Sequence, residues 1–242
     1  MRLPAPLLRG LLIRRYKRFL ADIELDSGEV ITAHCANPGS MLGLKTPGQK
    51  VWVSRNDNPK RKLKYSWELT EVDDGAGPAM VGINTSAPNT IVHEALIAGI
   101  IPELAGYTHI RREVNYGAGS RIDFLLEADG RRPCYVEVKN AHLLRRTGRA
   151  EFPDSVTARG TRHLHELLDM VRDGARAMML YVIQRTDAEV FSLAGDIDPA
   201  YAQAFLEARA GGVEACAYAC RIDEKEITLG ASIPFHAAAT AP

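Results

Sequence analysis

Residues 120–140 constrain the fold more than any other stretch, because they have the pattern of a β-hairpin with charges on one face. Apolar residues alternate along both predicted strands: Ile122, Phe124, Leu126, Val136 and Val138. Asp129-Gly130 between the two strands favours a tight turn. Because successive side chains point to opposite faces of a strand, Asp123 is expected to point away from the first apolar set, and Glu137 and Lys139 are expected to share a face.

The register of this hairpin brings two carboxylates together. A turn centred near Gly130 places Asp123 opposite Glu137, with Cβ atoms roughly 4.5–5.5 Å apart. Carboxylates at that distance repel each other unless a cation lies between them, and Mg²⁺ or Mn²⁺ with oxygen ligands would fill that role. Asp…Glu-x-Lys is typical of metal-dependent phosphodiesterases, in which Lys139 would stabilise a phosphate or a water. A solvent-exposed strand face, with Asp123 paired to Arg121 or Lys139, is the alternative.

Charge is distributed unevenly along the 242 residues, although the formal net charge is zero. Residues 1–65 contain 13 lysines and arginines against 5 acidic residues, a balance of +8, so the remainder carries −8. This asymmetry suggests a basic binding part joined to an acidic, metal-binding part. Four cysteines without a CxxC motif favour a reduced, cytoplasmic protein. We expect no signal peptide and no membrane span.

The first part of the chain is expected to be all-β. Residues 7–15, 19–25, 30–34, 51–54, 64–72 and 80–83 alternate or are rich in β-formers, with turns at Asp26-Ser27-Gly28 and Asp73-Asp74-Gly75. Five or six short strands predict a small barrel of the OB type, which commonly binds oligonucleotides or oligosaccharides. The polar segment 84–89 is the predicted domain boundary, which gives domains 1–84 and 85–242.

Cations interleaved with aromatic residues favour nucleic acid as the partner, because cations hold phosphates and aromatic rings stack on bases. The predicted contacts of the barrel are Arg14, Arg15, Lys17, Arg18, Lys60, Arg61, Lys62 and Lys64. A second group near the start of a predicted helix contains Arg159, Arg162 and His163. Solvated basic loops and a solvated helix face are the alternatives.

The second part is expected to be a mixed sheet flanked by helices, since elements follow in the order α-β-β-β-α-β and then α-β. A helix over 90–100 contains Glu94, which is either a surface residue or an outer metal ligand. A strand is predicted at 108–116, a loop at 143–154, and a helix that begins after Asp154, Ser155 or Thr157 and ends at Gly174. The apolar run 177–183 predicts a buried strand, with Gln184 at its end. Asp198-Pro199 begins a third helix, which ends before Gly211.

The chain resembles the sugar fermentation stimulation protein (SfsA) family over nearly its whole length. The matching motifs are Arg15-Tyr16-Lys17-Arg18-Phe19-Leu20-Ala21-Asp22, Asn37 with Gly39-Ser40-Met41, Asn58-Pro59-Lys60-Arg61-Lys62, Gly82-Ile83-Asn84-Thr85, Ser120-Arg121-Ile122-Asp123, Glu137-Val138-Lys139-Asn140, Phe152-Pro153-Asp154, Thr157, Arg159-Gly160 and His163-Leu164. Two positions depart from the family pattern, since Pro38 and His142 stand where threonines are expected.

The resemblance implies an α+β protein of two domains, an N-terminal OB-like barrel and a C-terminal domain similar to PD-(D/E)xK nucleases. Carried over by position, the catalytic core is Asp123, Glu137 and Lys139, with Glu94 on the first helix and Gln184 as an auxiliary polar group. The implied metal ligands are Asp123, Glu137, the carbonyl of Val138 and Glu94, holding Mg²⁺ or Mn²⁺.

The expected function is therefore metal-dependent DNA cleavage, with single- or double-stranded DNA as the partner and RNA as a second candidate. Two alternatives remain open. One is a non-catalytic DNA-binding regulator of sugar-utilisation genes, which the family association suggests, and the other is oligosaccharide binding by the barrel. The sequence leaves the oligomeric state open.

Overall fold

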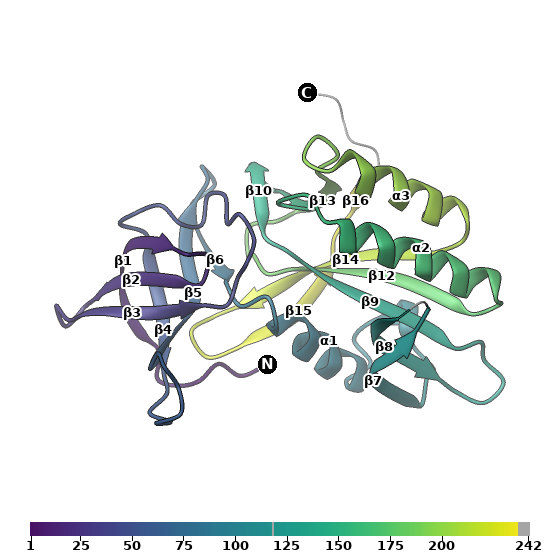
Figure 1. The fold of residues 1–242 in the computed structure, drawn as a ribbon, viewed down its shortest axis with the longest axis horizontal. Coiled ribbons are helices and arrows are strands. Elements are labelled where there is room, and N and C mark those ends of the chain that lie inside the picture. The colour runs from purple at the N-terminus through teal and green to yellow at the C-terminus, as the bar shows by residue number, and fades with distance from the viewer. Residues whose placement is uncertain (118, 237–242) are drawn as a thin grey trace.

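The alternating segments of the first 84 residues form six strands in the computed structural model, which describes residues 1–117 and 119–236 (Figure 1). These strands are β1 (Leu8–Tyr16), β2 (Leu20–Leu25), β3 (Val30–Cys35), β4 (Lys50–Arg55), β5 (Tyr65–Asp73) and β6 (Pro78–Gly82). Their order is β3-β2-β1-β4-β5-β6, and a parallel pairing of β3 with β5 closes a five-stranded barrel. The predicted OB-type barrel is confirmed.

The second part of the chain forms a six-stranded mixed sheet with helices on both faces, as predicted. Its elements are α1 (Ala87–Ile97), the short 3₁₀ turn η1 (Pro102–Leu104), β7 (His109–Tyr116), β8 (Ser120–Glu127), β9 (Cys134–Ala141), α2 (Ala158–Arg172), β12 (Arg176–Ile183), α3 (Pro199–Ala210), β14 (Glu214–Ile222) and β15 (Ile227–Ser232). The strand order is β15-β14-β12-β9-β8-β7. Strands β9, β12 and β14 are parallel, and β7, β8 and β9 form an antiparallel meander.

The prediction of a loop over residues 143–154 is wrong. Residues there form the hairpin β10 (Leu143–Arg146) and β11 (Arg149–Phe152), which joins β13 (Val190–Leu193) and β16 (Phe235–His236) in a small second sheet. The segment looks loop-like because it is rich in charge. In the fold, the Arg145 guanidinium is held by the carboxylates of Glu151 and Asp196, so a charged residue is accommodated in a strand.

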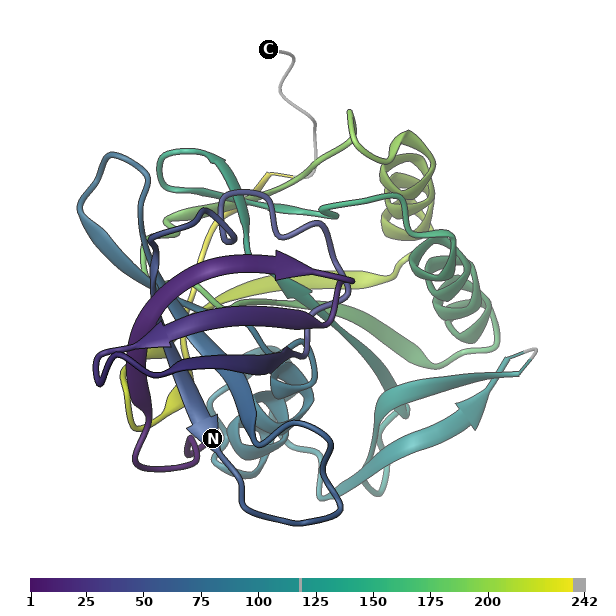
Figure 2. The same cartoon turned by 60° about the vertical axis from the view of Figure 1, so that its left-hand side comes forward.

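Two apolar clusters cover the faces of the large sheet. One contains residues of α1 and the other contains residues of α2 and α3, which lie side by side in both views (Figures 1 and 2). Trp52 and Leu69 of the barrel belong to the α1 cluster, so the barrel and the sheet share a continuous apolar contact. Within the described residues, no helix is long and apolar enough to cross a membrane.

Polar contacts also join the two domains. The Arg185 guanidinium, only 1% exposed, donates to the carboxylates of Asp74 and Asp187 and to the carbonyl of His142. We call Arg185, Asp74, Asp187 and His142 the interdomain cluster. A second link runs from Asp154, whose carboxylate accepts the backbone N–H of Ser40 at 2.8 Å.

Candidate active site

The strands β8 and β9 separate at Asp123, and this separation creates the site. Phe124 pairs with Val136 in the predicted register, and the ladder ends there. Beyond it, one oxygen of Asp123 accepts the Val138 N–H at 2.8 Å and the other accepts the side-chain amide of Asn89 at 2.7 Å. The Asp123 carboxylate therefore joins β8 to β9 and to the first turn of α1.

The separation also interrupts the alternation of side chains along β8. Phe124 and Leu126 pack in the α1 cluster as expected, but Ile122 packs in the cluster of α2 and α3. The prediction that Ile122 shares a face with Phe124 and Leu126 is wrong, because the regular pleat does not continue through Asp123. Asp123 is thereby turned into a pocket beside Glu137.

Glu137 lies at the centre of a buried group of polar side chains. Its Oε1 atom accepts Lys139 Nζ at 2.6 Å and is also bonded to Nδ1 of His163. Nε2 of His163 accepts Arg159 Nε at 3.3 Å, so the ring proton lies on Nδ1 and is donated to Glu137. The side chains of Glu137 and His163 are 4% and 2% exposed. We call Asp123, Glu137, Lys139 and His163 the site cluster.

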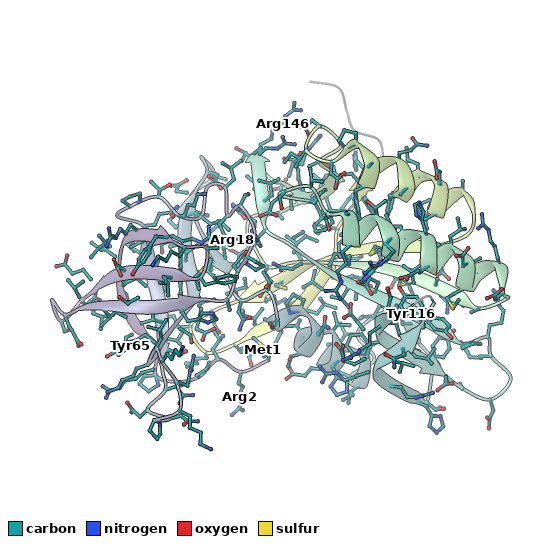
Figure 3. The ribbon with its side chains drawn as sticks, viewed as in Figure 1. Met1, Arg2, Arg18, Tyr65, Tyr116 and Arg146 are labelled. Atoms are coloured by element: carbon teal, nitrogen blue, oxygen red, sulfur yellow. The ribbon has the colours of Figure 1, made fainter. Side chains whose placement is uncertain are left out.

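Several polar atoms in and around this cluster have no partner. Among the described residues, Glu137 Oε2 and Ser120 Oγ are buried without a hydrogen bond, and the Tyr116 hydroxyl lies beside the Glu166 carboxylate. Ser120 pairs with Tyr116 across β7 and β8, and Tyr116 lies between α2 and these strands (Figure 3). Buried polar groups are nearly always hydrogen-bonded, so a concentration of unpaired ones marks a site that a ligand or solvent completes.

The carboxylates of the cluster differ in their affinity for protons. Burial, together with the nearby Glu137 charge, raises the pKa of Asp123 to about 6. Burial alone would also raise the pKa of Glu137, but Lys139 and His163 favour its charged form and the pKa falls below its usual value. The result is a carboxylate pair in which Glu137 stays ionised and Asp123 is poorly compensated, which is typical of functional sites.

The site cluster opens into a polar pocket of about 470 Å³ between the start of α1, strand β9 and the start of α2. Its walls include Ser86, Asn89, Arg112, Thr157 and Arg159 in addition to the carboxylates and Lys139. A neighbouring hollow of about 390 Å³ shares Glu113 and Arg159 with it and includes the exposed Arg162. Arg112, Lys139 and Arg159 therefore stand beside the carboxylates in the pocket, an arrangement suited to an anionic ligand.

Comparison with known proteins identifies the family. The model described as "SfsA N-terminal OB domain" matches residues 13–83, and that described as "Sugar fermentation stimulation protein RE domain" matches residues 86–226. The chain belongs to the SfsA family. Sugar fermentation stimulation protein homologues from Methylobacterium nodulans and Paramagnetospirillum magneticum are 55% and 56% identical to it. These matches cover 97% and 96% of this chain and 98% and 97% of the relatives.

A solved SfsA structure has the same fold. It is that of Pyrococcus furiosus SfsA in complex with Ca²⁺, which matches with a TM-score of 0.85 and 27% sequence identity over 98% of each chain. The likeness thus extends over both domains.

The two departures from the expected SfsA pattern lie at the domain interface. The Pro38 carbonyl accepts the guanidinium of Arg18, on the side of the barrel that faces the second domain (Figure 3). His142 is buried and contacts Asn37 and Asn140. Burial lowers the pKa of His142 to about 4, although Asp154 lies 3.8 Å away. Neither residue lines the pocket of the site cluster.

Glu94 and Gln184 are the expected SfsA site residues that the structure places elsewhere. Glu94 is half-exposed and pairs with the amino group of Met1, because it follows Asn89 by five residues and so points about 140° away around the helix. Gln184 is buried at the domain boundary and donates to the Asn84 carbonyl and to Asn140 Oδ1. Neither residue lines the pocket of the site cluster. We therefore do not include Glu94 among the candidate metal ligands or Gln184 among the candidate catalytic residues.

The expected DNA contacts of this SfsA protein divide into bound and exposed cations. Arg15 and Arg18 hold backbone carbonyls of the 37–39 turn, and Arg14 pairs with Asp22. His163 is 1% exposed and bonded to Glu137, and it also lines the hollow beside Arg162, so its contact with a nucleic acid stays a prediction. The exposed members without a bond to the barrel are Lys17, Lys60, Lys62, Lys64, Arg159 and Arg162, while Arg14 and Arg18 are exposed as well as bound. Arg61 is partly buried and donates to Ser66 Oγ.

Asn89 is the main site residue that the sequence did not indicate. It lies in the first turn of α1 after Pro88 and fixes the Asp123 carboxylate through its side-chain amide. A single asparagine near a helix start is common, so no local signal separates it from a surface residue. Only the packing of α1 against the end of β8 shows its role.

Proposed function

We propose that this chain is a metal-dependent nuclease that acts on DNA. The observation that carries the proposal is the buried Asp123–Glu137 pair, with an unpartnered Glu137 oxygen, beside Lys139 in a pocket that also contains arginines. Carboxylates in that arrangement attract a hard cation, and the neighbouring cations suit a phosphate diester.

The donor set fits a divalent cation. Asp123 and Glu137 would hold Mg²⁺ or Mn²⁺, with the Val138 carbonyl as a third candidate ligand. Among the described residues there is no group of three or more histidine, cysteine or acidic side chains that could hold a metal, so solvent would complete the coordination, as is usual for Mg²⁺. The Ca²⁺ bound by Pyrococcus furiosus SfsA supports a hard cation. The cation would supply Lewis-acid polarisation of the phosphate.

The remaining groups act on water and phosphate. Lys139, held by Glu137 at 2.6 Å, is positioned to orient an attacking water and to stabilise negative charge that develops on the phosphate. Arg159 faces the same pocket and holds His163, whose Nδ1–H in turn orients Glu137. Asn89 and the Val138 N–H fix both oxygens of Asp123.

DNA is the proposed substrate because exposed cations accompany the site. Lys60, Lys62 and Lys64 lie exposed on the loop between β4 and β5 of the barrel, and Arg159 and Arg162 lie beside the pocket. Binding through such cations is expected to weaken steeply as salt concentration rises. All four cysteines are free in the structure, which supports the proposed cytoplasmic setting.

The test is cleavage of labelled single-stranded and duplex DNA in EDTA, Mg²⁺ or Mn²⁺. We expect metal-dependent cleavage that Asp123→Ala abolishes and that Lys139→Ala lowers about 10²–10³-fold, the usual cost of losing one charge-stabilising donor. Glu94→Ala is the matched control, because it removes a carboxylate outside the pocket and should cleave like the wild type. Equal cleavage by all four proteins would indicate a contaminating nuclease. Binding without cleavage under every metal would favour the non-catalytic DNA-binding protein.

A further inference from the structure

A second polar pocket, of about 360 Å³, lies on the barrel next to the linker between the domains. Its walls include His34, Ser54, Arg61, Glu68 and Asn84. Ser86 lines both this pocket and the pocket of the site cluster, so the two adjoin across the linker. A strand bound at the candidate active site would therefore extend directly to the barrel pocket.

Glu68 is brought into this pocket by a β-bulge. Val53 pairs with Trp67 and Trp52 pairs with Leu69, which leaves Glu68 as the extra residue of β5. On its other side, the Glu68 carbonyl accepts the Ile83 N–H at 2.8 Å and so continues the register of β5 with β6. Bulges characteristically redirect one side chain, and here the redirected side chain is a carboxylate among buried residues.

The Glu68 carboxylate is incompletely satisfied. The residue is 8% exposed, and its Oε1 accepts Ser54 Oγ at 2.6 Å. Its Oε2 is not among the buried unpaired atoms, so it is open to the pocket, and the nearby Arg61, which donates to Ser66 Oγ, favours the charged carboxylate. Burial raises the pKa of Glu68. A largely buried carboxylate with one oxygen open to a pocket can accept hydrogen bonds from a ligand that enters it.

The surroundings of Glu68 suit a nucleotide. Arg55 and Arg61 supply positive charge at the pocket wall, which suits a phosphate, and His34 supplies an aromatic ring that already stacks with Phe19. Unpaired bases are typically stacked on such rings and read through hydrogen bonds to their Watson–Crick edges. Guanine presents two adjacent N–H donors on that edge, at N1 and N2, and a carboxylate can accept both.

We propose that this pocket binds an unpaired guanine of the nucleic-acid strand, with Glu68 accepting its N1–H and N2–H. The inference rests on the proposed function in that it takes nucleic acid as the ligand. In this proposal the barrel recognises one base next to the proposed cleavage site. The exposed lysines would contact phosphates, which are the same at every base, and so would not contribute to sequence specificity.

The test measures binding by fluorescence anisotropy with the full chain in EDTA, where no metal-dependent cleavage occurs. The probes are single-stranded oligothymidylates with one central guanine, inosine or adenine. Inosine lacks only the 2-amino group of guanine. We expect guanine to be bound about 10-fold more tightly than inosine or adenine, within the range of a good bidentate contact. Glu68→Gln should bind all three probes alike.

Glu71→Gln is the matched control, because Glu71 lies on the same strand but pairs with the exposed Lys50. It should keep the preference for guanine. The comparison of guanine with inosine uses only the wild-type protein. It therefore tests the predicted base preference even if Glu68→Gln fails to fold. Binding without any base preference, or a preference that survives in Glu68→Gln, would overturn this inference alone. If the protein bound none of the three probes, both the guanine site and the proposed action on DNA would be contradicted.

Discussion

The site cluster and the interdomain cluster are both buried groups of charges, but only one of them is complete. In the interdomain cluster, each side-chain nitrogen of Arg185 has a partner, and Asp74, which accepts one of these bonds, keeps a third of its side chain in contact with solvent. In the site cluster, Glu137 is 4% exposed and one of its oxygens has no partner among the described residues.

This difference indicates that the interdomain cluster stabilises the fold and that the site cluster binds a ligand. A fully paired buried cation stabilises a particular arrangement of two domains, and breaking it leaves uncompensated charge. An incompletely paired carboxylate pair destabilises the free protein locally and gains its missing partner on binding. Substitutions in the first should therefore change stability, and those in the second should change binding and cleavage.

The largest effect on stability is expected for Arg185→Met. The substitution leaves Asp74, Asp187 and the His142 carbonyl without their donor, and breaking a buried pair in this way typically costs about 3–5 kcal/mol. Urea unfolding measures the loss. Arg172→Met is the control. Arg172 and Asp169 form an exposed ion pair, and losing such a pair changes the free energy of unfolding by no more than about 0.5 kcal/mol. Equal free energies of unfolding for the two variants would contradict a stabilising role for the interdomain cluster.

A smaller effect, on rate alone, is expected for His163→Ala. Loss of a residue that orients a metal ligand commonly lowers activity about 10–100-fold, so kcat should fall while KM stays nearly constant. His163→Asn should recover part of the rate, since its amide nitrogen can replace Nδ1 as the donor to Glu137. A purely structural role predicts instead that both variants lose stability and that neither recovers kcat.

The smallest effect concerns the pH dependence of stability. The pKa of His142 is about 4 in the folded protein, below the ordinary value of 6.5, and the groups around it are Asp154, Arg185 and Arg15. Between these pH values the unfolded chain binds a proton that the folded chain does not, so stability is lost as pH falls from about 6.5 to about 4.

From pH 7 to pH 5 this histidine should remove about 2 kcal/mol from the free energy of unfolding. His142→Thr, which restores the residue expected from the family, should lose correspondingly less over the same interval. Urea unfolding of both proteins at the two pH values measures the difference. Identical pH dependence would mean that His142 does not stay neutral in the fold.

The contrast between the two clusters also explains what could be predicted from the sequence. The proximity of Asp123, Glu137 and Lys139 was expected from alternation and hairpin register, although that register holds only as far as Phe124 and Val136. The sequence does not show that Asn89, and not Glu94, faces the site, or that His163 contacts Glu137. Both contacts depend on how the helices are rotated against the sheet. Glu68 depends on a bulge, which shifts the alternation by one residue without any mark in the local sequence.

Larger features divide in the same way. The barrel and the order of most elements of the large sheet follow from the apolar periodicity, and the structure confirms them, but β13, β15 and β16 were not expected. The hairpin of β10 and β11 was not expected, because Arg145 is compensated there by Glu151 of the same hairpin together with Asp196, which is distant in sequence.

The most direct test of an incomplete site is the thermal unfolding of the metal-free protein as CaCl₂ is added. A cation that completes the site cluster stabilises the folded state by about 2.7 kcal/mol at a concentration 100-fold above Kd, so Tm of the wild type should rise by several degrees. Glu137→Gln keeps an oxygen that can accept from Lys139 and His163, but it removes the charge that attracts the cation, so its Tm should not respond to CaCl₂. Glu94→Gln should respond like the wild type. An unresponsive wild type, or an equal rise in Glu137→Gln, would contradict the proposal that these carboxylates form a cation site.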